Sequence, residues 1–402
     1  MEANFSGSGH VQWSKETKNL RTTLFRTLVT ANMRTAIGRL PVLVCIFASS
    51  SRQHALAFGS FGTTTWWRSQ GQLFPVHQSH RRFTNVKSSN LASALSATSI
   101  DLEAYKTELS YEDCQDLLTT AEEAARAAGA IITSHLGCCS ELEEECEIKY
   151  SIKDIVTEYD KQAQDAIESI VRSKFPDHSF LGEEDVDPGA AASEAALTNI
   201  LTKTNDGYLW ICDPIDGTAN FAQGMPLCAV TMGVVYRGTP IVGVVYDPHR
   251  DEMFSAIRDH GATMNGEPIQ VSQAISEAKD AIINAGCPAD PNAFETSMRG
   301  VLALNSRCRG IRVVACSALT TAWIACGRLA AHYGYDLSSW DLVAGALLIQ
   351  EAGGLVTDLD SSPYKLETRN MLCSCNGGQV HEEILSVLRE ADAVSFTRAS
   401  SS

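Results

Sequence analysis

Positive charge is scarce over most of this 402-residue chain. Residues 1–100 hold 11 Lys/Arg and two acidic residues, whereas the remaining 302 residues hold 21 Lys/Arg and 46 Asp/Glu, a net charge of −25. A nucleic-acid surface needs clustered Lys and Arg, so the acidic body predicts no nucleic-acid partner. Such a body binds a polyanionic small molecule only where metal cations intervene.

The sequence also has no regular cysteine framework, and its N-terminal apolar run is short. The run Leu40–Ala48 has nine residues, whereas a membrane-spanning helix needs about 20. The 13 cysteines include CC at 138–139 and CSC at 373–375 but lack the CxxC pairs of a zinc site. We therefore expect reduced thiols in a reducing compartment, and no membrane partner for the mature protein.

The first hundred residues are rich in Ser, Thr and Arg, poor in acids and without a sustained helical or strand period. This profile is typical of a targeting segment, and Leu40–Ala48 is long enough for a signal-peptide core. The following ALAFGS resembles the Ala-Phe cleavage motif of plastid presequences in algae with secondary plastids. We interpret residues 1–104 as a largely disordered targeting presequence that directs the protein to a plastid. The alternative is a cytoplasmic protein with a tail that carries no address, or with a start codon assigned too early.

Residues 105–272 have the pattern of an α+β subdomain. Small and apolar residues recur at helical spacing from Tyr111, and a second helix is expected from Asp160 to about Lys174. A short strand at 178–181 precedes an Ala/Gly/Ser-rich insertion that holds one short helix. The buried strand YLWICD then leads into an antiparallel meander with turns at RGTP, DPHRDE and RDHG.

Strands and helices alternate after residue 272, which predicts a second, α/β subdomain over residues 273–392. AIINAG, GIRVVA, LAAHYGY and LVTDLD are strand-like, whereas ALTTAWIACG, WDLVAGALLIQEAGG and HEEILSVLREA are helix-like. Residues 393–402 are expected to be a disordered tail. The body is therefore predicted to consist of two stacked α/β halves, and no internal repeat is visible.

Acidic residues mark the ends of four predicted elements. Taken singly, each is explained at least as well by a helix cap or a solvated turn. The pair in CDPIDGT is harder to explain in this way, because Pro214 stiffens the backbone and Gly217 permits close approach of a ligand. The four signals are DIVTEYD with Asp154 and Asp160, GEED with Glu183 and Glu184, CDPIDGT with Asp213 and Asp216, and WD with Asp341.

A magnesium site with more than one ion would unite these carboxylates. Hard cations take oxygen ligands from carboxylates, backbone carbonyls and waters, and two nearby ions can clamp both reacting oxygens of a phosphoryl group. The amides of Gly217 and Thr218 lie where a helix is expected to begin, which is a natural site for a phosphate. The pattern therefore favours phosphoryl chemistry over a purely structural role.

The motifs resemble those of the inositol monophosphatase family. CDPIDGTANFAQGMP is similar to the first family signature, WDLVAGALLIQEAGGLVTD to the second, and GEED and the run Lys149 to Asp160 also match. The resemblance spans about residues 110–392, with the four motifs in family order. It implies an α/β fold, the layered αβαβα sandwich of the inositol monophosphatase and fructose bisphosphatase type. It also implies a homodimer with Mg²⁺-dependent, lithium-sensitive hydrolysis of phosphate monoesters.

The resemblance also implies roles for individual residues and two to three Mg²⁺ ions per site. One ion would be held by Glu183, Asp213 and the carbonyl of Ile215, a second by Asp213, Asp216 and Asp341, and a third by Glu183 through waters. Thr218, paired with Asp160, would orient and deprotonate the attacking water, and Lys149 would lie near the outer metal waters. The residues implied in substrate binding are Asp216, Gly217, Thr218, Asp341, Ala315 and Ser317.

This chain departs from the family pattern where the substrate alcohol is expected to bind. The family's Gly-Ser-Ala-Ala segment reads Ala315-Cys316-Ser317-Ala318, and a family glutamate that contacts inositol hydroxyls is replaced by Gly334. Gly-Arg-Leu-Asp-Ala reads GRLAAHY, without its Asp, and Tyr335 or Asp336 is a candidate substitute. These departures leave the metal ligands intact and concern the inositol preference.

The leading interpretation is therefore a phosphate-monoester hydrolase of the inositol-1-phosphate type, acting on a small phosphorylated polyol or sugar. Alternatives of the same class are a histidinol-phosphate phosphatase, a sugar-1-phosphate phosphatase and a 3′(2′),5′-bisphosphate nucleotidase. TANFAQGMP is closer to the inositol type than to the Lys-Ser-Phe variant of histidinol-phosphate phosphatases. An alternative of a different class is a catalytically silent relative that binds metal. Loss of Thr218 or Asp160 would have favoured it, and both are present.

Overall fold

The computed structural model describes residues 60–61, 64–69, 72–75, 109–138, 146–148, 155–204, 207–375 and 378–399. Contacts divide the chain into two compact units, residues 1–85 and 86–402. In the first unit, three strands pair antiparallel in the order β1-β2-β3. They lie within the expected presequence, where Thr and Trp in TTWWRS supply β propensity, and the rest of residues 1–108 lies outside the described residues. The strands are β1 (Ser60–Phe61), β2 (Thr64–Ser69) and β3 (Gln72–Pro75).

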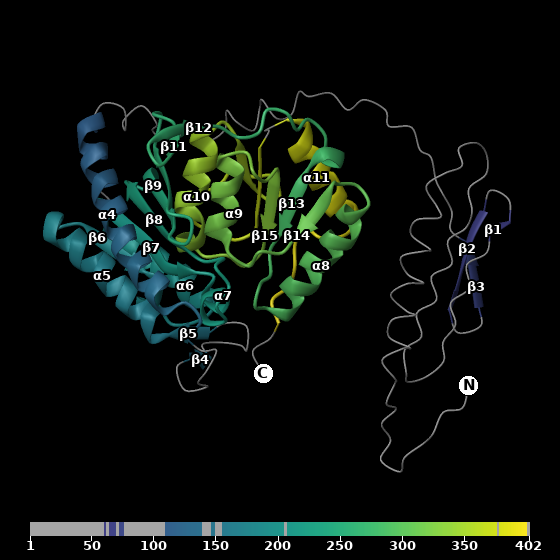
Figure 1. Cartoon of the computed structure of the whole chain (residues 1–402), viewed down its shortest axis with the longest axis horizontal. Coiled ribbons are helices and arrows are strands. Elements are labelled where there is room, and N and C mark those ends of the chain that lie inside the picture. Colours follow the sequence, from purple (N-terminus) through teal and green to yellow (C-terminus); the bar gives the residue numbers. More distant parts are fainter. Residues whose placement is uncertain are drawn as a thin grey trace, which may run out of the picture. The chain divides into compact units, whose positions relative to one another are not determined.

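The second unit is a sandwich of five layers in the order helix, sheet, helix, sheet, helix (Figure 1). The layered αβαβα fold is therefore confirmed. Two outer helices cover one face of the first sheet, two central helices lie between the sheets, and two further helices cover the second sheet. These pairs are α4 (Tyr111–His135) with α5 (Glu158–Lys174), α9 (Ser317–Ala325) with α10 (Ser339–Glu351), and α8 (Pro291–Asn305) with α11 (Gln379–Glu390).

The first sheet has seven strands in the order β12-β11-β10-β9-β8-β7-β6. Its neighbours are antiparallel except β6 and β7, which run parallel. Next to it lie a two-stranded ribbon and two short helices. The elements are β4 (Cys146–Ile148), β5 (Ile155–Thr157), β6 (Ser179–Gly182), α6 (Ala190–Lys203), β7 (Tyr208–Asp216), α7 (Thr218–Ala222), β8 (Ala229–Tyr236), β9 (Thr239–Asp247), β10 (Glu252–Ile257), β11 (Ala262–Met264) and β12 (Glu267–Ile269).

The second sheet is mixed, with five strands in the order β14-β13-β15-β17-β16. Strand β13 pairs parallel with β14 and β15, whereas β17 pairs antiparallel with β15 and β16. The two sheets fall on either side of residue 272, where the sequence predicts a boundary, yet both belong to one compact unit. The strands are β13 (Ile282–Ala285), β14 (Gly310–Arg312), β15 (Ala331–Gly334), β16 (Leu355–Asp358) and β17 (Met371–Ser374).

The outer helices are amphipathic and begin at side-chain caps. Ser110 and Asp113 form a capping box at the start of α4, and Thr157 and Asp160 form one at the start of α5. Helix α5 therefore begins at Glu158, two residues before the predicted start. The buried stripe of α4 packs on the first sheet through small residues that recur every three or four positions.

The central helices are apolar around most of their circumference, because a sheet covers them on either side. Their close contact depends on Gly345 of α10, since a Cβ there would lie 2.1 Å from the hydroxyl oxygen of Thr321 on α9. This contact with α9 fixes the position of α10. The N-terminus of α10 lies near the ends of β6 and β7.

Some elements differ from the sequence-based expectation. The insertion after β6 contains one helix as expected, α6, although it is longer than expected at 14 residues, whereas the sequence pattern predicts neither α8 nor β17. Residues 393–399, expected to be a disordered tail, make hydrogen bonds and ion pairs with the body. Hydrogen bonds between side chains of the body and the backbone of the tail hold this segment, together with the ion pairs of Arg398 with Glu194 and Asp336. Its composition alone does not reveal these contacts.

Two further properties concern only the part of the chain that the structure describes. No helix there combines the length and apolarity needed to cross a bilayer. Ten of the cysteines within it are free thiols.

Candidate metal centre

The parallel pairing of β6 and β7 brings the first two acidic motifs together. Gly182 of β6 is in register with Cys212 of β7, so Glu183 and Asp213 are the next residues on adjacent strands. Because parallel strands end at the same edge of a sheet, these two carboxylates emerge side by side. Gln164 of α5, which is fully buried, accepts a hydrogen bond from the amide of Glu184 (2.9 Å) and so fixes the turn after β6.

Helix α10 brings the third carboxylate to the same edge. Oxygen atoms of Glu183, Asp213 and Asp341 all lie within 4.8 Å of one another. Asp341 is in the first turn of α10, where the amide of Ser338 donates to its Oδ2 (2.7 Å). The structure thus brings together three predicted metal ligands from three separate elements.

Asp216 lies at the other side of a bulge in β7 and has different neighbours. Strand β7 loses its register with β8 between Asp213 and Asp216, which allows both side chains to reach the strand end. Asp216 accepts hydrogen bonds from the amide of Ala318 and from the thiol of Cys316 (3.3 Å). Burial and the Asp216 charge raise the pKa of Cys316 well above its usual range, so the thiol stays protonated and can donate.

The electrostatics of this cluster favour a bound cation. Burial, together with repulsion from neighbouring carboxylates, raises the pKa of Asp213 and of Asp341 well above the usual range. Burial raises the pKa of Asp216 to about 6, although its two hydrogen bonds oppose the rise. A cation would relieve this repulsion. The donors are all oxygen atoms, which fits a hard ion such as Mg²⁺ better than zinc.

Thr218 and Asp160 meet beside the cluster, as predicted. The Thr218 hydroxyl lies 3.2 Å from Oδ1 of Asp160 and 3.0 Å from the carbonyl oxygen of Ile215. The other oxygen of Asp160 accepts from the amide (2.8 Å) and hydroxyl (2.7 Å) of Thr157. Asp160 is 2% exposed, so its carboxylate is held rigidly with one oxygen toward Thr218. It is both a helix cap and a member of the site.

A cavity of about 230 Å³ opens over the cluster. It is lined by the carboxylates and by residues from the second sheet and the start of α9, so the site lies between the two halves. The predicted site residues on its wall are Glu183, Asp213, Ile215, Asp216, Gly217, Thr218, Ala315, Ser317 and Asp341. Lys149 and Asp154 lie outside the described residues.

The segment between β14 and α9 is held against the acidic motif of β7. The side-chain amide of Asn220 on α7 donates to the carbonyls of Leu227 and Val314, both at 2.9 Å. Gly217 has φ 91°, and a Cβ there would lie 2.9 Å from the Leu227 carbonyl oxygen. Ala315 has φ 55°, an uncommon conformation for a residue with a side chain. This close fit explains the glycine of CDPIDGT.

The cavity also contains a buried pair that the sequence reading missed. Asn284 of β13 donates from its amide nitrogen to Nδ1 of His332 on β15 (2.9 Å), while its oxygen accepts from the amide of Val314. Burial lowers the pKa of His332 to about 4, so the ring is neutral. With Nδ1 as an acceptor, the proton of the ring lies on Nε2. A polar residue within each of two apolar strands was the only sequence signal.

Gly334 and its neighbours show where the family pattern is lost. A Cβ at Gly334 would lie 2.7 Å from Cδ1 of Leu337 and 3.3 Å from Nε2 of His332, so Leu337 occupies the space of a larger side chain. Of the two candidate substitutes, Tyr335 lines the cavity, whereas Asp336 does not.

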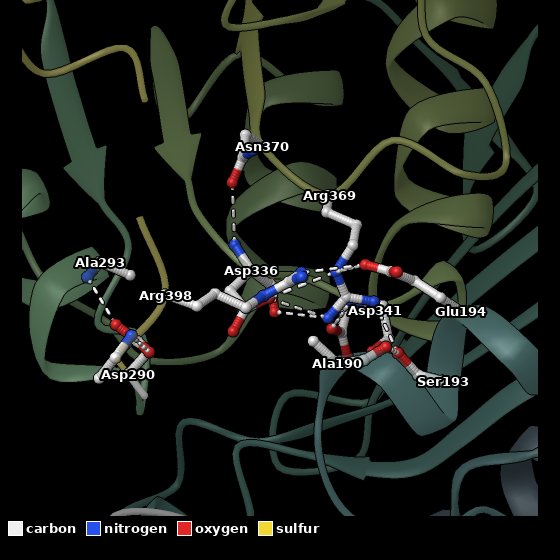
Figure 2. A network of polar contacts seen from close by, with 12 residues as sticks. Ala190, Ser193, Glu194, Asp290, Ala293, Asp336, Asp341, Arg369, Asn370 and Arg398 are labelled. Carbon is white, nitrogen blue, oxygen red and sulfur yellow. Dashed lines mark hydrogen bonds and ion pairs between the residues drawn. The ribbon is translucent and has the colours of Figure 1, made fainter. Parts of the chain in front are cut away.

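A second cavity of about 490 Å³ adjoins the first and shares Glu183 and Asp341 with it. Figure 2 shows the polar network on its wall, where Asp336 lies between the guanidinium groups of Arg369 and Arg398. Glu194 of α6 also reaches both arginines. The sequence reading did not find this network, because its members are far apart along the chain.

Together, the layered α/β fold and the carboxylates at its strand and helix ends define a protein of the layered αβαβα class with an acidic site that could hold a metal ion. The model of the inositol monophosphatase family matches residues 113–393. The chain belongs to the inositol monophosphatase family.

Individual relatives agree with this assignment. An inositol-1-monophosphatase from Synechocystis is 34% identical over 285 residues, which cover 71% of this chain and 93% of that protein. A chloroplastic phosphatase from Arabidopsis thaliana is 33% identical over 240 residues, covering 58% of this chain and 61% of its own. Among solved structures, an inositol monophosphatase (IMPase) from Thermotoga maritima has a TM-score of 0.59 at 30% identity and covers 69% of this chain and 98% of its own.

Proposed function

We propose that this protein is a Mg²⁺-dependent phosphatase that hydrolyses an inositol monophosphate. The observation that carries the proposal is the convergence of Glu183, Asp213 and Asp341 within 4.8 Å beside Thr218 and its partner Asp160. Family membership supports the same reaction class and gives no support to the alternatives within it. A catalytically silent relative is less favoured, because the Thr218–Asp160 pair is complete.

The metal ligands would divide into two sets that share Asp213. Glu183, Asp213 and the carbonyl oxygen of Ile215 would form one set, and Asp213, Asp216 and Asp341 the other. These two sets would hold two ions, and a third ion would bind at Glu183 through waters. Bound Mg²⁺ would supply charge neutralisation for the phosphate and a lower pKa for the attacking water.

The remaining roles belong to side chains and amides of the chain. Asp160 is buried and fully oriented, so it can accept a proton that reaches it through the Thr218 hydroxyl. The amides of Gly217 and Thr218 would bind phosphate oxygens. Phosphoryl transfer requires mainly such positioning and charge neutralisation.

The size of the cavity supports a compact alcohol as the leaving group. A volume of about 230 Å³ is below the roughly 300–1,000 Å³ typical of sites for drug-sized ligands, and it suits a single cyclitol or sugar ring. Ala315, Ser317, Asp216 and Asp341 would contact the hydroxyls of that ring. The neutral His332 and the absent side chain at Gly334 would set the preference among such rings.

The test is phosphate release from four substrates, with Mg²⁺, with a chelator and with added Li⁺. We expect the highest kcat/KM with inositol 1-phosphate, no release without Mg²⁺, and inhibition by Li⁺. Histidinol phosphate, galactose 1-phosphate and a 3′,5′-bisphosphate nucleotide represent the alternatives, and a clear preference for one of them would replace the proposed substrate. No release from any of the four would favour the silent relative.

We also propose plastid import and a homodimer. The basic, Ser/Thr-rich N-terminal segment and the existence of a chloroplastic relative support the first, and the family resemblance supports the second. A fluorescent fusion to residues 1–104 that stays in the cytoplasm would contradict import, and a monomeric mass in solution would contradict the dimer.

A further inference from the structure

The C-terminal tail, residues 393–399, lies beside the larger cavity, the one that shares Glu183 and Asp341 with the smaller cavity. The Thr397 carbonyl accepts a hydrogen bond from the side chain of Asn292 (2.9 Å), and the amide of Ala399 donates to Asp290 (2.9 Å). Both partners lie at the start of α8. Since the match to the family model ends at residue 393, residues 394–399 lie beyond the matched region.

Arg398 places a cation from this tail on Asp336. Its Nη2 atom lies 2.9 Å from Oδ1 of Asp336 and 3.0 Å from Oε1 of Glu194. Arg369 approaches Asp336 from its other side, with Nη2 3.1 Å from the same Oδ1 atom. Figure 2 shows the two guanidinium groups converging on this carboxylate. The Asp336 side chain is only 17% exposed, so the pairs are partly shielded from solvent screening.

Asp336 is connected to a proposed metal ligand through the loop that joins β15 to α10. It has φ 55°, which is uncommon for a residue with a side chain, and its amide donates to Asn370 (3.1 Å). Two residues later, the amide of Ser338 donates to Oδ2 of Asp341 (2.7 Å). A shift of Asp336 would therefore move the group that orients the Asp341 carboxylate.

The tail also contacts the residue on the other side of Asp336. The Tyr335 hydroxyl donates to the carbonyl of Ala393 (2.5 Å), and the Phe396 ring packs edge-on against the Tyr335 ring with centroids 6.2 Å apart. Tyr335 lines the smaller cavity. The loop is thus held by the tail at two successive residues.

We propose that Arg398 is a positioning residue, which holds the β15–α10 loop so that Asp341 faces Glu183 and Asp213. The inference rests on the proposed function, because it assigns Asp341 to the metal. Without Arg398, Asp336 keeps only the Arg369 pair, and the left-handed backbone at position 336 loses part of its support. Asp341 then samples orientations that bind a cation less well.

The experiment compares Mg²⁺ affinity in the full chain and its variants by two readouts. One is the Mg²⁺ concentration for half-maximal phosphate release, and the other is the Mg²⁺ concentration for half of the metal-induced rise in Tm. We expect Arg398→Ala to raise both concentrations by about three- to fivefold, which corresponds to about 0.7–1 kcal/mol. Arg398→Lys should recover part of the loss, and removal of residues 394–402 should reproduce it.

Arg309→Ala is the matched control. Arg309 forms a 3.1 Å ion pair with Asp280, at 62% and 41% side-chain exposure, and it lines neither cavity. A merely structural role for Arg398 would lower Tm without moving either Mg²⁺ concentration. If Arg398→Ala fails to fold, Arg398→Lys and the shortened chain still decide the question.

The outcomes separate this inference from the proposed function. A wild-type protein without Mg²⁺-dependent hydrolysis and without a Mg²⁺-dependent rise in Tm would contradict the proposed function. An active wild type whose Mg²⁺ dependence is unchanged in both Arg398→Ala and the shortened chain would overturn the role of Arg398 alone.

Discussion

Asp213 and Asp216 belong to the same strand, but they have different hydrogen-bond partners and therefore different roles. Oδ1 of Asp213 accepts one hydrogen bond from the amide of Ile215 (2.9 Å), and an oxygen of the same carboxylate belongs to the cluster. Asp216 is held by the amide of Ala318 and the thiol of Cys316. A change at position 213 should therefore affect the cluster most directly.

Asp213→Asn should abolish hydrolysis and leave the fold intact. The variant loses the carboxylate that both proposed metal sets share, whereas removal of one repelling charge does not weaken the metal-free protein. Steady-state phosphate release and Tm without metal are the measurements. Asp165→Asn changes an exposed carboxylate on α5 that forms an ion pair with Lys161 (3.1 Å), and it should behave as the wild type. Wild-type turnover in Asp213→Asn would contradict the ligand assignment.

His381 should make the protein less stable in mild acid. Burial and the charge of Arg389 lower its pKa to about 4, while the unfolded value is near 6.5. Between these values the unfolded chain binds the proton and the folded protein does not, so the free energy of unfolding falls as the pH falls from about 6.5 to 4.

The expected loss from His381 between pH 7.5 and pH 5 is about 2 kcal/mol. Urea unfolding of the wild type and of His381→Gln at both pH values measures it. The variant loses the contacts of the ring with Thr357 and Ser374 at both pH values, so only the difference between the two pH values is compared. An equal difference in both proteins would contradict the assignment.

Residues that act through local patterns were predictable, and those that act through distant contacts were not. The carboxylates at element ends could be read from turn and cap chemistry, and the resemblance then supplied their roles. His332, Asn284 and Arg398 have no such local pattern, because the partners described above are 30 or more residues away. Only the folded chain brings these groups into contact.

At the scale of elements, the central helices were easier to predict than α8. Within WDLVAGALLIQEAGG, the stretch from Leu342 to Ile349 is continuously apolar, since both faces of α10 are covered. Helix α8 buries small and polar residues such as Thr296, Ser297 and Gly300, whereas Leu302 of the same helix is 78% exposed. Its large apolar residues therefore do not mark its buried face, although Asp290 caps it and Pro291 opens it.

Gly345→Ala should destabilise the contact between the two central helices. The new Cβ would lie 2.1 Å from the Thr321 hydroxyl oxygen and 2.6 Å from its Cβ, so α9 and α10 must separate. Overpacking of this kind costs about 1–3 kcal/mol, against about 1 kcal/mol gained from helix propensity. We expect lower Tm and weaker activity, since α10 carries Asp341.

Gly207→Ala is a suitable control for this change. Its nearest neighbours would be 3.9 Å from the new Cβ, so the added methyl meets open space. Unfolding of both variants in urea measures the contrast. Equal stability of Gly345→Ala and the wild type would show that the helices can shift without cost.

At the scale of the whole molecule, the catalytic unit should be independent of the N-terminal unit. Contacts place the division near residue 85, and the family match begins at residue 113. Removal of residues 1–85 should therefore leave kcat/KM within about twofold and Tm within about 2 °C of the full chain. A large loss of either would show that the N-terminal unit supports the catalytic one.

A deeper truncation gives the contrast. Removal of residues 1–124 deletes half of α4, including the buried Leu117 and Ala121, and exposes the first sheet. We expect this shorter chain to be insoluble or unfolded. The two deletions together locate the start of the catalytic unit, for which the sequence predicts residue 105.

The arrangement of the layers was harder to predict from the sequence than the order of the helices and strands. The change in pattern near residue 272 matches the gap between the two sheets. The sequence could not show that α9 and α10 lie between those sheets. An apolar pattern indicates that a helix is buried, but it does not indicate which other elements pack against it. That part of the fold came from the family resemblance.

The position of Arg398 at the larger cavity has a consequence for the order in which the site forms during synthesis. Its partner Glu194 precedes it by 204 residues, which a ribosome adds in roughly 10–40 s at typical rates of synthesis. A growing chain therefore carries Glu183, Asp213 and Asp341 before the tail that closes beside them exists. The finished wall of the larger cavity therefore first appears once Arg398 has been added, long after its partner Glu194.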